Sequence, residues 1–382
     1  MKRVIPVSLI LLLICVQAGA ATFVINGKQV TIPSTVAGGK TYVDPVALCK
    51  ALGLTITYDT AKKQYVVSTQ SQVGAQGTAQ MAGDWAEMGK EYSLGKGNPM
   101  NFALRSAEFS ASRVRIGEEV FFPKGNEKFL VLHYTVHNPQ KSEQSASWNT
   151  FDFTAVDATN QNREFSQEVG QEANSLPLGS MYLKPAQKVE VYTFIVVPAA
   201  GEIPKLIVKR GEGAVLRYDL RGKVKPLAAP FADPSDTTGS TALSEVPVQL
   251  GVYCPTGLFD VKVEPASYTS ESYADREPKA GSRHLVVNVS FKNQTGEAQY
   301  VGWNTFTPKV VTKGGETIAY NENLLNASRD ESLRGDVPAG QEIRGRFFFQ
   351  VRNDDLAAKL LIQEGADRDE NRRFAVDLST IR

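Results

Sequence analysis

Two long segments of the chain match one another, in order and at a nearly constant spacing. Leu130–Asn138 is followed by Trp148–Phe151, and the same motifs return as Leu285–Asn293 and Trp303–Phe306. Further pairs continue the match with a drift of one or two residues: Pro185-Ala186 with Pro338-Ala339, Lys205–Val208 with Lys359–Ile362, and Asp219-Leu220 with Asp377-Leu378. An ordered series of this kind predicts two tandem copies of one folding unit.

Each copy has the residue pattern of β-structure. Short alternating runs rich in Val, Phe, Tyr and Thr are separated by clusters of Gly, Pro, Asn and Asp, and helical periodicity is almost absent. At about 120 residues, a copy of this kind predicts an antiparallel β-sandwich.

The arrangement of motifs in each copy resembles a known family. A strand ending in Asn, a Trp-x-x-Phe motif and a Pro-Ala step before a further strand resemble the immunoglobulin-like extracellular domains of unknown function in secreted bacterial proteins. The arrangement is also similar to the mycobacterial immunoprotective-antigen sandwich. The resemblance implies an extracellular β-sandwich and no particular activity, because sandwich folds host many functions.

Residues 22–68 predict a small α+β module in the order strand, strand, helix, strand, strand. The Asn26-Gly27 turn predicts an opening hairpin, and Asp44-Pro45 is a typical helix start. Together with Ala51–Leu54 and Tyr65–Val67, these motifs resemble the copper amine oxidase N-terminal-like domain. The resemblance implies an accessory attachment module without copper ligands.

The N-terminus has the three parts of a secretory signal. Lys2 and Arg3 precede the apolar run Val4–Val16, and Ala18–Ala20 predicts cleavage after Ala20. The apolar run is too short to span a membrane, so we expect an exported chain with no transmembrane segment in its mature form. Cys15 follows Ile14 rather than a small residue, which argues against a lipoprotein.

The predicted fold class is therefore mostly β, with a small α+β N-terminal module followed by two tandem antiparallel immunoglobulin-like β-sandwiches. Segments rich in Gln, Gly, Ala, Ser or Pro predict the linkers between them. The expected organisation is a signal peptide at 1–20, the N-terminal module at 22–68, a linker at 69–99, the first sandwich at 100–222, a second linker at 223–246 and the second sandwich at 247–382.

Composition and motifs argue against several functions. With 42 basic and 41 acidic residues, the chain has no basic excess for nucleic acid. The sequence contains no Gly-x-Ser-x-Gly, His-Glu-x-x-His or phosphate-binding Gly-x-x-x-x-Gly-Lys-Ser/Thr motif. It also lacks the Thr-x-x-Asn-Tyr setting of a copper amine oxidase. We therefore expect no catalytic residue, no cofactor and no enzyme activity.

Two groups of residues have part of the pattern of a metal site. His133 and His137 share one face of a predicted strand, but about 13 Å separates residues four apart on a strand, too far to grip one ion. Asp367, Asp369 and Asn371 have the spacing of a calcium loop but lack its Gly and terminal Glu. We expect two surface histidines, a solvated turn and no metal.

The predicted mature chain retains two cysteines. Cys49 lies in a helical pattern, where a thiol usually behaves as a small buried hydrophobe, and Cys254 lies in another domain. Export permits a disulfide between them, but a scaffold of this size does not need one, so unpaired thiols are favoured.

The repeated tryptophan is the candidate binding residue. If the strands are regular, Trp148 is out of phase with Phe151, and Trp303 with Phe306, so both rings point away from the core. An exposed Trp can stack on a sugar or anchor a protein. The favoured alternative is that each strand begins after the Trp, which then closes one end of the sandwich.

These observations favour a secreted or cell-surface protein that binds or attaches without catalysis. Its expected partner is a cell-envelope polysaccharide or an extracellular protein. Two alternatives stay open: a glycan-directed hydrolytic enzyme using loop carboxylates, and a passive surface spacer.

Overall fold

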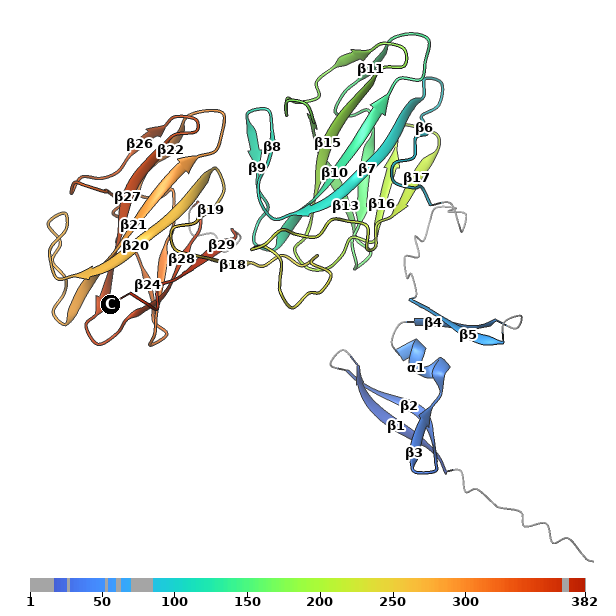
Figure 1. Cartoon of the computed structure of the whole chain (residues 1–382), viewed down its shortest axis with the longest axis horizontal. Coiled ribbons are helices and arrows are strands. Elements are labelled where there is room, and N and C mark those ends of the chain that lie inside the picture. The colour runs from blue at the N-terminus through green and yellow to red at the C-terminus, as the bar shows by residue number, and fades with distance from the viewer. Residues whose placement is uncertain are drawn as a thin grey trace, which may run out of the picture. The chain divides into compact units, whose positions relative to one another are not determined.

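The computed structural model describes residues 17–25, 28–51, 54–59, 63–69, 85–365 and 371–381 (Figure 1). The chain divides into two compact units, Met1–Gln80 and Met81–Arg382. The fold is mostly β, as predicted, with one short helix among the described residues.

The first unit contains a three-stranded antiparallel sheet, a helix and a hairpin. The sheet has the order β1 (Gln17–Ile25), β2 (Lys28–Ala37), β3 (Lys40–Val43), and the hairpin pairs β4 (Leu54–Asp59) with β5 (Gln64–Thr69). β3 was not predicted; it forms because Gly38 and Gly39, both with positive φ, turn the chain back onto β2. Residues 1–16 of the predicted signal peptide lie outside the described residues.

Helix α1 (Pro45–Ala51) begins where the sequence predicted. The Asp44 carboxylate caps it by accepting hydrogen bonds from the backbone N–H of Val46, at 2.8 Å, and of Ala47, at 3.3 Å. Pro45 fits the first helical turn because its missing N–H has no partner to lose there. Cys49 is buried on this helix, in agreement with its predicted structural role.

The second unit begins with the first sandwich. Its strands are β6 (Tyr92–Leu94), β7 (Met100–Ser110), β8 (Val114–Ile116), β9 (Glu119–Phe121), β10 (Glu127–His137), β11 (Gln144–Ala146), β12 (Asp152–Val156), β13 (Asn162–Gln171), β14 (Met181–Leu183), β15 (Lys188–Pro198), β16 (Lys205–Lys209) and β17 (Val215–Asp219). The main strands are connected in the order β17-β16-β12-β13-β15-β10-β7-β6. The first part of β13 pairs with β12 and its last part with β15, so this strand passes from one sheet to the other.

The second sandwich has two separate five-stranded sheets, with the orders β18-β29-β28-β23-β24 and β19-β20-β21-β27-β25. Its strands are β18 (Glu245–Val248), β19 (Tyr253–Pro255), β20 (Phe259–Thr269), β21 (Ser282–Asn293), β22 (Gln299–Val301), β23 (Lys309–Thr312), β24 (Thr317–Ala319), β25 (Leu325–Asn326), β26 (Gly335–Val337), β27 (Glu342–Arg352), β28 (Ala357–Ile362) and β29 (Arg373–Asp377). The pairing of β18 with β29 is parallel, an exception to the predicted antiparallel arrangement.

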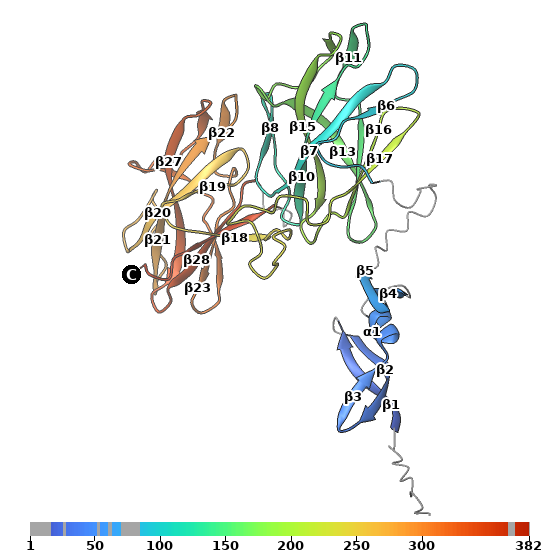
Figure 2. The same ribbon diagram turned by 45° about the vertical axis from the view of Figure 1, so that its right-hand side comes forward.

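Each sandwich also carries a short two-stranded ribbon, β11–β14 in the first and β22–β26 in the second. Figure 2 labels one strand of each ribbon, β11 and β22, near the upper end of its sandwich. A buried asparagine fixes each ribbon. The Nδ2 of Asn138 donates to the carbonyl of Leu183 in β14, and the Nδ2 of Asn293 donates to that of Val337 in β26, both at 2.8 Å. The repeated Asn of the sequence is therefore a structural tie between a central strand and the ribbon.

The predicted linker 69–99 is shorter in the structure than in the sequence analysis. Residues 70–84 lie outside the described residues, but residues 85–99 belong to the first sandwich, where β6 pairs with β7. Ala86 and Leu94 are buried in its core. These isolated apolar residues are enough to dock a segment whose overall composition is that of a linker.

Residues 223–246, also predicted as a linker, join the two sandwiches as a packed segment. Leu227 and Phe231 are buried, and the ammonium of Lys128 from β10 donates to the carbonyls of Ala199, at 3.1 Å, Gly201, at 2.6 Å, and Ser240. Buried charges require several partners, and Lys128 finds them partly in this segment. The polar composition was misread because turns with internal hydrogen bonds use the same residues as flexible linkers.

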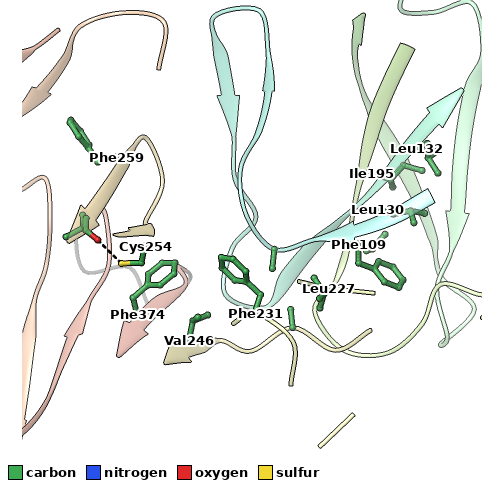
Figure 3. Packing of buried hydrophobic residues seen from close by; sticks show 14 of the residues in the cluster. Phe109, Leu130, Leu132, Ile195, Leu227, Phe231, Val246, Cys254, Phe259 and Phe374 are labelled. Atoms are coloured by element: carbon green, nitrogen blue, oxygen red, sulfur yellow. Dashed lines mark hydrogen bonds between the residues drawn. The ribbon is translucent and has the colours of Figure 1, made fainter. Parts of the chain in front are cut away.

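The two sandwiches contact one another directly. Phe231 of the connecting segment packs edge to face against Phe374 of β29, with ring centroids 6.2 Å apart (Figure 3). The guanidinium of Arg113 donates to the Asp260 carboxylate at 2.6 Å, and that of Arg372 donates to the carbonyl of Glu127 at 2.5 Å. The largest cluster of buried apolar residues runs through both sandwiches, and two smaller clusters lie apart from it.

Candidate functional site

Trp148 and Trp303 occupy the same position in two equivalent turns. In the first sandwich the Thr150 N–H donates to the Ser147 carbonyl at 3.0 Å, and in the second the Thr305 N–H donates to the Gly302 carbonyl at 3.1 Å. The threonine hydroxyl closes each turn by accepting from the first residue's N–H, at 2.7 and 2.8 Å. Each Trp is therefore the second residue of a doubly bonded β-turn.

Both tryptophan rings are exposed, to 41% for Trp148 and 55% for Trp303. Neither lies in a strand, because β12 begins at Asp152 and β23 at Lys309. The outward direction comes from the turn, not from the strand alternation used in the sequence analysis. Phe151 and Phe306 follow in each sandwich and are buried, so the repeated Trp-x-x-Phe motif pairs an outward ring with a core ring.

Each sandwich adds an exposed tyrosine to the same end. Tyr182 is the middle residue of β14 and pairs across the ribbon with Ser145; Tyr300 is the middle residue of β22 and pairs with Asp336. Their exposed fractions are 69% and 56%. We define the aromatic tip of each sandwich as Trp148 with Tyr182, and Trp303 with Tyr300.

The sequence analysis missed the two tyrosines because they come from different strands of the repeated ribbon. Alternation could have identified them, since each precedes a buried residue, Leu183 or Val301, in a three-residue strand. In the second sandwich a Cβ added to Gly302 would lie 2.7 Å from the Tyr300 ring. This ring therefore covers the glycine that opens the Trp303 turn.

A polar cleft adjoins the Trp148 turn of the first sandwich. It has a volume of about 810 Å³ and is formed by the β6–β7 loop, the β11–β12 segment and the β16–β17 loop. The residues that line it are Gly95, Lys96, Gly97, Asn98, Ser145, Ser147, Asn149, Thr150, Arg210, Gly211 and Glu212. Hydroxyl, amide and charged groups thus surround the space, and the chain neighbours of Trp148, Ser147 and Asn149, line it although the Trp itself does not. We call this space the tip cleft.

Arg210 holds one side of the tip cleft together. Its guanidinium donates to the Asn98 carbonyl, and a Cβ added to Gly95 would lie 2.9 Å from its Nη1. Glycine at position 95 therefore allows the arginine to pass against the β6–β7 loop. Burial lowers the pKa of Arg210 from its ordinary value.

Glu364 occupies the corresponding position in the second sandwich, where it accepts hydrogen bonds from a loop instead of donating one. It follows β28 as Arg210 follows β16, and its carboxylate accepts from the N–H groups of Leu258, at 2.9 Å, and Phe259, at 3.1 Å. The Thr256 hydroxyl donates to it at 2.9 Å. Burial raises the pKa of Glu364 despite these donors.

The histidines form separate contacts on the outer face of the first sandwich. His133 Nδ1 lies 2.6 Å from the Glu172 carboxylate, and His137 Nδ1 lies 2.6 Å from that of Glu91. Burial raises the pKa of Glu91, but hydrogen bonds from His137, Asn101 and other groups outweigh it and lower the pKa to about 2. The shared face was predicted; the carboxylate partners were not.

The other candidate residues do not assemble into a site among the described residues. Cys49 and Cys254 are buried and free. Within the described ranges, no group of three or more His, Cys, Asp and Glu residues could hold a metal ion. Asp367 and Asp369 lie outside these ranges, and Asn371 donates its Nδ2 to the Glu364 carbonyl at 2.7 Å, so its amide is engaged within the fold.

Comparison with known families finds one match. Residues 253–372, in the second sandwich, match the family described as Domain of unknown function (DUF4352). No curated protein matches the chain. The resemblance of residues 22–68 to the copper amine oxidase N-terminal-like domain therefore stays a prediction.

The solved structures that resemble part of this chain include a β-sandwich protein and a secreted protein. An uncharacterized β-sandwich protein from Clostridium difficile is 9% identical and covers 35% of this chain and 93% of its own, with a TM-score of 0.26. The secreted protein MPT63 from Mycobacterium tuberculosis is 13% identical, with coverages of 35% and 97% and a TM-score of 0.27. The yjhA protein from Bacillus subtilis is 12% identical, with coverages of 34% and 98% and a TM-score of 0.23. At these TM-scores the β-sandwich description rests on the chain's own strands.

Proposed function

We propose that the chain is an exported, non-catalytic binding protein that attaches to the cell envelope or to an extracellular protein through the aromatic tips of its two duplicated, immunoglobulin-like sandwiches. The observation that carries this proposal is the presence of the same exposed Trp, in the same doubly bonded turn, at the end of both sandwiches. A large exposed ring on a fixed turn loses little conformational freedom on binding.

Export is supported by the signal-like segment before Ala21. In the part of the chain that the structure describes, no helix is long and apolar enough to cross a membrane. The N-terminal module, by its resemblance to an attachment module, would supply a second point of contact.

The composition of the tip cleft argues against the hydrolytic alternative. Glycoside hydrolysis ordinarily uses two carboxyl groups, about 5 to 10 Å apart, across the bond that is cleaved. Among the described residues that line the cleft, Glu212 is the single carboxylate. The spacer alternative makes a different prediction, namely that substitution of the tips changes nothing.

Two weak tips on one chain should bind a repetitive surface more tightly than either tip alone. The test is co-sedimentation of the mature chain, residues 21–382, with isolated cell envelope and with its polysaccharide fraction. Trp148→Ala and Trp303→Ala should each reduce the fraction bound to the whole cell envelope, and the double variant should reduce it by more than either. Trp85→Ala is the matched control, because this ring is 38% exposed but lies over Lys205, at the opposite end of β16 from the tip cleft.

Envelope binding that survives the double variant would refute a role for the tips and assign attachment to residues 22–68. The spacer alternative would be favoured if the parent chain binds neither envelope nor polysaccharide and if every variant binds secreted proteins to the same extent as the parent chain.

A further inference from the structure

We infer that the tip cleft of the first sandwich is a saccharide-binding site, and that the described residues at the corresponding end of the second sandwich serve the contact between the sandwiches instead. The inference rests on the proposed function and deepens it, because it names the ligand class and assigns the two sandwiches different roles. The ligand is a segment of a neutral polysaccharide. One of its sugar rings lies against Trp148, and the adjoining sugars lie in the cleft.

The lining of the tip cleft matches a polyhydroxylated ligand. Pockets for drug-like molecules of about 300 to 1,000 Å³ are lined mainly by apolar side chains. The tip cleft falls in that range of volume, but its lining is polar apart from glycine, with hydroxyl groups from Ser145 and Ser147 and amides from Asn98 and Asn149. Such groups donate and accept hydrogen bonds, as sugar hydroxyls require.

The charges of the cleft favour a neutral chain over a polyanion. Lys96 and Arg210 bring positive charge and Glu212 brings negative charge to the same rim. The Arg210 guanidinium is in addition engaged with the Asn98 carbonyl. A phosphate-rich or nucleic-acid ligand would require a clear excess of free basic groups, which this rim does not provide.

The Trp148 turn is rigid at the point where a sugar would stack. The Ser147 hydroxyl donates to Asn149 Oδ1 at 2.6 Å, and the Trp148 N–H donates to the Leu178 carbonyl at 3.1 Å. The residues on both sides of the ring are therefore fixed before any ligand arrives. An aromatic face beside fixed polar groups presents an apolar surface and hydrogen-bonding groups to the same ring of a sugar.

The described residues at the corresponding end of the second sandwich are arranged differently. Glu364 draws the β19–β20 loop onto β28, and a Cβ added to Gly257 would lie 3.0 Å from its carboxylate. The same region faces the first sandwich, since Arg113 donates to the Phe259 carbonyl at 3.0 Å. Arg210 and the longer β6–β7 loop leave the corresponding end of the first sandwich open. One sandwich thus presents the cleft, and the other uses the equivalent loop for the contact between sandwiches.

The experiment is isothermal titration of the mature chain with soluble cello-, malto- and chito-oligosaccharides and with glycan chains released from peptidoglycan. Trp148→Ala should reduce the affinity for the bound saccharide at least tenfold, and Asn149→Ala should also reduce it. The matched controls are Trp303→Ala and Asn304→Ala at the equivalent turn, which should leave the affinity within twofold of the parent chain.

A third variant blocks the cleft without removing a contact. Ser145→Tyr introduces at an exposed ribbon position the residue that the second sandwich carries there as Tyr300, and its ring would occupy the cleft. It should abolish saccharide binding while the circular dichroism spectrum stays that of the parent chain.

The inference is overturned if none of these saccharides binds, or if the variants of the second sandwich weaken binding as much as those of the first. Envelope binding that depends on both Trp residues, combined with no saccharide binding, would overturn the inference and leave the proposed function standing with a protein partner. If the chain binds neither the envelope nor a saccharide, both the inference and the proposed function are overturned.

Discussion

The buried Lys128 makes the stability of the second unit depend on pH in a direction that can be calculated. Its side chain is fully buried, and burial lowers its pKa from 10.5 to about 8. In the unfolded chain the lysine remains protonated up to its ordinary pKa. Between pH 8 and 10.5 the unfolded state therefore binds more protons than the folded state, and the free energy of unfolding rises with pH.

The size of the effect follows from the shift. A difference of about 2.5 pKa units at about 1.4 kcal/mol per unit gives a gain of about 3 kcal/mol across this window, and nothing below pH 8. Lys128→Met removes the titrating group. Its carbonyl partners at Gly201 and Ser240 then lose a donor, but the cost of that loss does not depend on pH and cancels in the comparison.

The assay is urea unfolding of the parent chain and Lys128→Met at pH 7.5, 8.5, 9.5 and 10, with reductant present. The stability difference between them should move in favour of the parent chain by about 1 kcal/mol per pH unit above pH 8. Lys209→Met, at a side chain that is 52% exposed, is the control for loss of an ordinary lysine. A difference that stays constant from pH 7.5 to 10 would show that the three carbonyls hold the Lys128 pKa at its usual value, and would refute the argument.

Three further predictions concern the junction, the ribbons and the turns. Arg372→Met removes the guanidinium that donates to carbonyls of the first sandwich and the connecting segment, so in calorimetry the two sandwiches should unfold in two transitions where in the parent chain they share one; a shared transition in the variant would contradict this. Asn138→Ala and Asn293→Ala each leave buried carbonyls without a donor and should cost about 2 to 4 kcal/mol in urea unfolding, whereas values under 1 kcal/mol would show that the ribbons do not need the tie. Thr150→Val removes the acceptor that closes the Trp148 turn, should cost about 1 kcal/mol and should weaken saccharide binding, while Thr305→Val should cost the same without changing that binding.

Stretches of the strands were predictable because burial there alternates with a period of two, although Phe129 and Val131 of β10 are also buried, against β8 and β9. In β10, Leu130, Leu132, Tyr134 and Val136 are buried while His133 and His137 face outward, as the sequence indicated. The connecting segment was not predictable in the same way. Its stability depends on partners far away in the chain, such as Lys128, and composition alone does not record them.

The candidate site was likewise predictable only in part. The sequence identified Trp148 and Trp303 as outward rings, but for a reason that the structure replaces. Tyr182 and Tyr300 were missed because one ribbon places its tyrosine on the second strand and the other on the first. Aligning the two copies position by position does not pair these tyrosines, because they lie on different strands of their ribbons.

The difference between the sandwiches is concentrated at one aligned position. Lys205–Val208 and Lys359–Ile362 match in sequence, and the residues that follow two positions later are Arg210 and Glu364. Both bind the loop that precedes the long strand of their sandwich, but the Arg210 guanidinium donates to a backbone carbonyl, whereas the Glu364 carboxylate accepts from backbone N–H groups and a hydroxyl. The two loops therefore present opposite backbone groups at this position: the first borders the tip cleft, and the second also contacts the first sandwich through the Phe259 carbonyl. A charge reversal at one position of a repeat is thus a sequence signal that two otherwise similar domains use the same end of the fold differently.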